Sequence, residues 1–77
     1  SQTKQICSIF MKHFNDLMEI ASPEELKNKI KEIVNASAIN QMDKRKIAFD
    51  ISSLDSTRSL QFYLTNSMLK YNGMGVR

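Results

Sequence analysis

Apolar residues recur at intervals of three and four along most of this 77-residue chain, and no period-two run of β-branched residues bounded by turn signals appears. Three-and-four spacing places side chains on one face of an α-helix, whereas alternation would place them on one face of a strand. The spaced residues are Ile6, Phe10, Phe14, Leu17 and Ala21 in residues 3–21, and Leu60, Tyr63, Leu64, Met68 and Tyr71 in residues 56–72. We therefore predict an all-α fold, a compact bundle of four or five short helices.

The start of the second helix carries the strongest local signal in the chain. Ser22 can accept a hydrogen bond from the exposed backbone amides, Pro23 suits the first helical position, and Glu25 completes a capping box. The acidic residues also favour the positive end of the helix dipole. This segment predicts a break near Ala21 and a helix over residues 23–35.

Cap residues mark two further helices in the second half of the chain. Asp43 fits the N-cap position of the third helix, and Asp55 or Ser56 fits that of the fourth. Asn72 and Gly73 form a standard stop signal for the fourth helix. We expect one helical domain over residues 1–77, with helices over residues 3–21, 23–35, 44–53 and 56–72.

Composition excludes several classes of protein. The single cysteine and the single histidine are too few for a disulfide scaffold or for a cysteine-rich zinc site. No apolar run approaches the roughly 18 residues that a membrane span needs, and the chain opens with no signal-peptide pattern. We therefore expect a cytoplasmic protein with no metal, no cofactor and no membrane partner.

The sequence also argues against an enzyme. Cys7 and His13 lie six residues apart, which is not one helical turn, so they do not share a face as a nucleophile and its base. Both glycines fall in the last five residues, which leaves no glycine-rich loop to bind phosphate. The acidic residues are scattered among lysines and arginines instead of converging on one place.

Positive charge gathers in two stretches of the second half. One is a run of three basic residues in the first turn of the predicted third helix, where free backbone amides also attract anions. The other is residues 56–77, whose three basic residues and lack of acids account for the net charge of +3. The candidate nucleic-acid-binding residues are Lys44, Arg45, Lys46, Arg58 and Lys70. The last two helices would then form a helix-turn-helix, although their turn lacks a glycine.

Apolar side chains exceed what one face of each helix requires. Phe62 and Leu69 fall opposite the apolar stripe of the last helix, and Phe49 points away from the stripe of the third. On the first helix the surplus residues are Cys7, Met11 and Met18. The chain has five methionines, whose flexible side chains suit an adaptable contact surface. The candidate interaction residues are Met11, Met18, Phe49, Phe62 and Leu69.

Two hypotheses of function follow. The preferred one is a small regulatory or adaptor module that contacts another protein, or a second copy of itself as a homodimer, through its helices. The alternative is a small nucleic-acid-binding regulator that uses the basic residues of the third and fourth helices. An irregular bundle could instead bury all the surplus apolar residues in its own core, and that possibility stays open on sequence alone.

Overall fold

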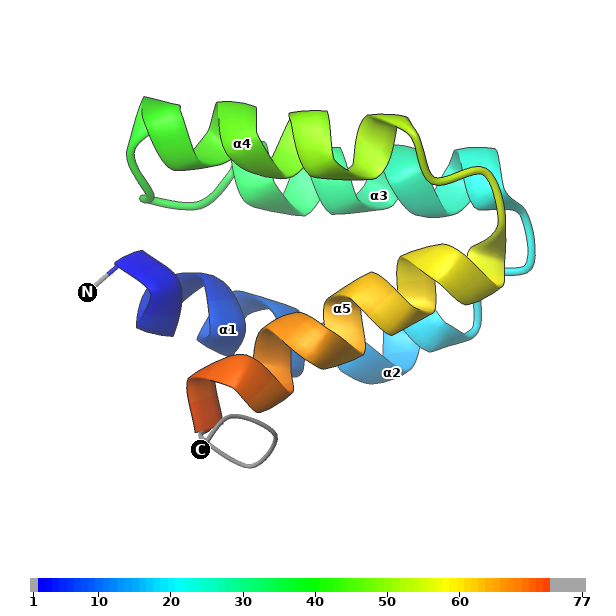
Figure 1. Cartoon of the computed structure of the whole chain (residues 1–77), viewed down its shortest axis with the longest axis horizontal. Coiled ribbons are helices and arrows are strands. Elements are labelled where there is room, and N and C mark those ends of the chain that lie inside the picture. The colour runs from blue at the N-terminus through cyan, green and yellow to red at the C-terminus, as the bar shows by residue number, and fades with distance from the viewer. Residues whose placement is uncertain (1, 73–77) are drawn as a thin grey trace.

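Five helices in two layers make up the described part of the chain (Figure 1). The computed structural model describes the backbone of residues 2–72 and the side chains of residues 4–69. The helices are α1 (Gln2–Lys12), α2 (Phe14–Met18), α3 (Pro23–Asn35), α4 (Gln41–Ser52) and α5 (Thr57–Asn72). Antiparallel α3 and α4 form one layer, and α1, α2 and α5 form the other (Figure 1). The predicted all-α bundle is confirmed.

The core lies between the two layers, and among the described residues it contains only apolar side chains. α5 packs on α1 and on α3, while α3 also packs on α4, α1 and α2. The buried residues of this core are Phe10, Leu17, Leu26, Ile30, Ile33, Val34, Ile39, Ile47, Ile51, Leu60 and Leu64. Removing these side chains from water is the main favourable term in the stability of so small a chain.

The first helix is interrupted, so the prediction of one helix over residues 3–21 is wrong. His13 has φ −105° and ψ 11°, which ends α1 and redirects the chain into α2. Backbone hydrogen bonds from His13 N to Ile9 O and from Leu17 N to His13 O continue on either side of the break. Before the bend α1 packs on both α5 and α3, and after it α2 packs on α3, so the wide apolar arc of this segment is shared among these contacts.

Helix α3 has the predicted bounds and the predicted cap. Ser22 is extended, and its hydroxyl oxygen accepts a hydrogen bond from Glu25 N at 3.3 Å. Pro23 opens the helix, where its missing N–H costs nothing. Ala21, which was expected to continue the apolar stripe of the first segment, instead lies exposed in the connection before this cap.

The start of α5 agrees with the prediction, and the start of α4 does not. The Ser56 hydroxyl oxygen accepts a hydrogen bond from Ser59 N at 3.1 Å and caps α5. Asn40, and not Asp43, caps α4: its Oδ1 accepts a hydrogen bond from Asp43 N at 2.7 Å, so the helix starts three residues early. Asn and Asp cap helices about equally well, which made the two starts hard to distinguish. The Gly73 stop signal lies outside the described residues.

A polar contact joins α4 to α5 beside the core. The Tyr63 hydroxyl donates a hydrogen bond to Asp50 Oδ2 at 3.1 Å, and Lys46 Nζ pairs with the same oxygen at 3.3 Å. Burial of the ring, the negative charge of Asp50 and this hydrogen bond all raise the pKa of Tyr63. The folded protein therefore disfavours an ionised Tyr63.

The Ser22→Ala variant should lose about 1 kcal/mol of free energy of unfolding, because the substitution removes the acceptor that caps α3. Urea denaturation followed by far-UV circular dichroism measures the change. Ser8→Ala is the matched control, since Ser8 is exposed on α1, and this variant should not lose stability. Equal midpoints for the two variants would show that the Ser22 cap contributes nothing.

Alkaline pH should destabilise the protein partly through Tyr63. The folded-state pKa lies above the unfolded value of about 10, so the unfolded chain loses the proton first. The stability contributed by this residue is complete below about pH 10 and declines as the pH rises above it. Tyr63→Phe lacks the titrating group, and its denaturation midpoint should fall less steeply than that of the wild type. If the denaturation midpoints of the two proteins fall equally steeply with rising pH, the raised pKa of Tyr63 in the folded protein is contradicted.

Candidate protein-interaction surface

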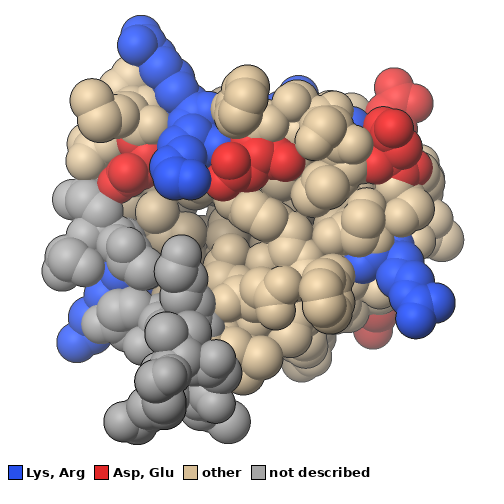
Figure 2. All heavy atoms as spheres, viewed as in Figure 1, with Lys and Arg blue, Asp and Glu red and all other residues tan. Residues whose placement is uncertain are grey.

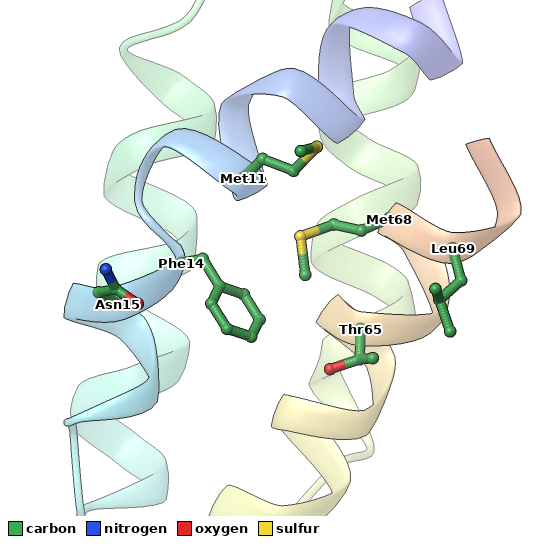
Figure 3. A pocket seen from close by; sticks show the side chains of 6 residues that line it. All are labelled: Met11, Phe14, Asn15, Thr65, Met68 and Leu69. Carbon is green, nitrogen blue, oxygen red and sulfur yellow. The ribbon is translucent and has the colours of Figure 1, made fainter. Parts of the chain in front are cut away.

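An open apolar groove lies between α1–α2 on one side and α5 on the other (Figure 3). Its volume is about 360 Å³. The lining residues are Met11, Phe14 and Asn15 from α1 and α2, and Thr65, Met68 and Leu69 from α5. Phe14 and Met68 project into the space between the two walls, with Met11 nearest one end and Thr65 nearest the other (Figure 3). The groove is therefore a shallow apolar channel with a few polar groups at its edges.

The outward side of α5 continues this groove. Phe62 is 67 % exposed, and Thr65, Asn66 and Leu69 follow it at the three-, four- and seven-residue spacing of one helix face. These four residues are called the α5 face below. Thr65 and Leu69 belong to both the α5 face and the groove, so the two adjoin, while Phe62 and Asn66 also line a separate hollow beside Asp50.

This surface carries no charge. Residues 59–69 contain no acidic or basic side chain, although charged residues make up 25 % of the chain. The run covers about three turns of helix. Figure 2 shows a broad uncharged area over the middle of α5, with charged side chains above it along α4 and at the right-hand edge. Of residues 59–69, Phe62 and Asn66 are exposed, and Leu60 and Leu64 are fully buried. Exposed Arg58 lies four residues before Phe62 on the same side of α5, so the uncharged area ends at the first turn of the helix.

The predicted interaction residues divide into exposed and packed ones. Met11 is 51 % exposed and lines the groove, and Phe62 is 67 % exposed and belongs to the α5 face. Phe49 is 78 % exposed and lies on α4. Leu69 is half-buried in the groove wall. Met18 does not join them, because it packs against the core. The groove thus brings together Met11 and Leu69 of the predicted set, beside Phe62.

Cys7 was expected on the same seam as Met11 but belongs to the interior. Its side chain is 2 % exposed, and its Sγ lies 3.6 Å from Met68 O and 3.8 Å from Met11 Sδ. Burial raises the pKa of the Cys7 thiol. Cys7 therefore holds the α1 wall of the groove against α5 instead of contributing to the surface.

A second exposed apolar pair lies on α4, and the sequence prediction missed half of it. Met42 and Phe49 are each 78 % exposed and stand seven residues apart on the outward side of the helix. Met42 had been placed before the start of the helix. Once α4 begins at Gln41, the seven-residue spacing aligns Met42 with Phe49.

The consecutive basic residues lie in a different setting from the one predicted. α4 begins three residues before the run at residues 44–46, which places them in its second turn, away from the free amides of the first. Lys44 Nζ donates a hydrogen bond to Asn35 O at 3.1 Å, and Lys46 Nζ pairs with Asp50. Two of the three cations are thus engaged with the protein itself.

The remaining basic candidates do not extend this run into one patch. Arg58 lies in the first turn of α5, at the opposite end of the molecule from the start of α4 (Figure 1). The side chain of Lys70 lies outside the described residues. α5 packs on α1 and α3, and α4 packs on α3, so the two helices are not arranged as a closely packed helix-turn-helix pair.

A smaller hollow of about 200 Å³ lies between α1, α4 and α5 and has a more polar lining. Among the described residues, one oxygen of Asp43, which lines this hollow, is buried without a hydrogen-bond partner, whereas Asp50 and Tyr63 bond to each other. Nowhere in the described chain do three histidine, cysteine, aspartate or glutamate side chains gather as a metal site would require. No described helix is both long and apolar enough to cross a membrane.

The chain matches no protein-family model, no curated protein and no solved structure. Functional inference therefore rests on the geometry of the described residues. The feature that distinguishes this geometry is the uncharged surface formed by the groove and the α5 face.

Proposed function

We propose that this chain is a small, non-enzymatic interaction module of the regulatory or adaptor kind, which binds a helix of a protein partner in the groove between α1–α2 and α5. The observation that carries the proposal is the apolar groove of about 360 Å³ between α1–α2 and α5. Isolated apolar side chains are common on small proteins, but a connected apolar channel rimmed by polar residues is typical of a binding site.

The groove has the features that helix-in-groove recognition requires. An amphipathic helix presents apolar side chains at helical spacing along one edge, and two walls such as α1–α2 and α5 can receive that edge. Met11 and Met68 supply flexible, polarisable contacts that can adapt to different side chains. Asn15 and Thr65 offer polar groups that would orient the bound helix.

Nucleic-acid binding takes second place in this proposal. Lys44 and Lys46 are already bonded to protein groups, and Arg58 stands at the other end of the molecule. A phosphate-binding surface would need these cations directed together into solvent. We also propose a cytoplasmic location, because a single buried cysteine suits a reducing compartment.

Selection from a displayed library of amphipathic helical peptides tests the proposed function. At low protein concentration, the wild type should enrich peptides with apolar residues at helical spacing, and fluorescence anisotropy gives their affinity. Met11→Glu places a charge at the groove, and it should weaken binding about tenfold or more. Met42→Glu makes the same change on α4, where the side chain is 78 % exposed, and should leave binding unchanged.

Two results would contradict the proposal: enrichment of no helical peptide, or equal binding by the wild type and the Met11→Glu variant. Titration with a random DNA duplex covers the alternative. Binding that weakens steeply as salt rises would favour nucleic acid, because it reports contacts with phosphates.

A further inference from the structure

We infer that the hollow between α4 and α5 binds an organic ammonium group, such as the end of a lysine side chain or of a small alkylamine. The hollow has a volume of about 420 Å³ and shares no lining residue with the groove. It is lined by Asp50 of α4, by Leu54 of the connection that follows, and by Ser59, Phe62, Tyr63 and Asn66 of α5. The inference goes beyond the proposed function, which concerns the groove.

The charge of the lining favours a cation. Asp50 is the one lining residue with a formal charge, and exposed Arg58 is not part of the lining. Acidic atoms lie along α4 above the uncharged area over α5 (Figure 2). A single carboxylate is too few to hold a divalent metal ion, and the described residues contain no cluster that could supply the other ligands. The hollow therefore suits an organic cation better than a metal ion or an anion.

Asp50 already pairs with one ammonium group and can accept a second. Its Oδ2 accepts hydrogen bonds from the Tyr63 hydroxyl at 3.1 Å and from Lys46 Nζ at 3.3 Å. Both of these described contacts use Oδ2, whereas an ionised carboxylate accepts at about four positions on its two oxygens. The Asp50 side chain is 28 % exposed, so a ligand can reach it from solvent. Lys46 is 71 % exposed, and an ion pair this open competes only weakly with a ligand.

Aromatic rings and an amide complete the site. Phe62 and Tyr63 both line the hollow, and the Phe62 ring is 67 % exposed. The face of an aromatic ring attracts a cation, and the carbons next to an ammonium group pack on the same face. The exposed Asn66 side chain offers a carbonyl oxygen to an ammonium N–H. Rings and amide can hold an alcohol as well, so the carboxylate is the group that selects for positive charge.

Titration with n-butylammonium chloride, followed by NMR of the Phe62 and Tyr63 ring signals, tests the inference. We expect a dissociation constant in the millimolar range, because the ligand is small and the hollow is open. The uncharged analogue 1-butanol should bind about tenfold more weakly or not at all, because it lacks the attraction to Asp50. Nα-acetyl-lysine methylamide distinguishes the two sources of the ammonium group: it should bind more tightly than n-butylammonium if the natural ligand is a lysine of another protein, and more weakly if it is a free amine.

Four variants assign the binding to the hollow. Asp50→Asn keeps the size of the side chain, removes its charge, and should weaken n-butylammonium binding about tenfold. Lys46→Gln removes the competing ammonium group and should strengthen it. Phe62→Leu should weaken binding about threefold through loss of the ring face. Phe49→Leu is the matched control, because it makes the same change at an exposed ring outside the hollow, and it should leave binding unchanged.

Two results would overturn the inference. One is equal binding of n-butylammonium and 1-butanol, which would mean that the hollow accepts any short apolar chain. The other is n-butylammonium binding that Phe62→Leu does not weaken. Circular dichroism shows whether each variant is folded, and Phe62→Leu changes an exposed side chain, so it tests the site even if Asp50→Asn does not fold. Neither result bears on the groove, whose test is the selection of helical peptides.

Discussion

The packing of α5 on α1 and α3 is the contact on which the rest of the structure depends. Leu60 and Leu64 are fully buried there and join the two helical layers. A chain of 77 residues builds one thin core, so each helix gives that core its best apolar stripe. Once Leu60 and Leu64 face inward, the opposite side of α5, with Phe62, must face outward. The exposed apolar surface is therefore a geometric consequence of the core that stabilises the fold.

Helix boundaries were predictable where one residue dominates the local chemistry. Ser22 caps the helix that the sequence assigned to it, and Ser56 is one of the two caps, with Asp55, that the sequence offered for α5. The start of α4 was not predictable, because Asn40 and a second good cap stand three residues apart and only tertiary packing selects between them. The break at His13 has no proline or glycine to announce it. α1 packs on both α5 and α3 and α2 packs on α3, and local spacing carries no information about these tertiary contacts.

The same break explains which parts of the candidate surface could be anticipated. Met11 and Met18 are seven residues apart and would share a face of a straight helix. Met18 follows the break, so this spacing does not apply to it, and it packs against the core. The exposure of Phe62 was predictable, because α5 is one uninterrupted helix, so the side of the helix opposite the buried stripe faces outward along its length. The groove itself was not, since it exists only where α1–α2 and α5 come together, and these elements are some 50 residues apart.

NMR spectra of the methionine methyl groups, recorded with and without an amphipathic helical peptide, test the central claim, that the groove between α1–α2 and α5 is a binding site, most directly. Met11 and Met68 line the groove, whereas Met42 is 78 % exposed on α4. Binding in the groove should shift the methyl signals of Met11 and Met68 and leave the signal of Met42 in place. A shift of the Met42 signal alone, or no shift of any of the three, would contradict the account.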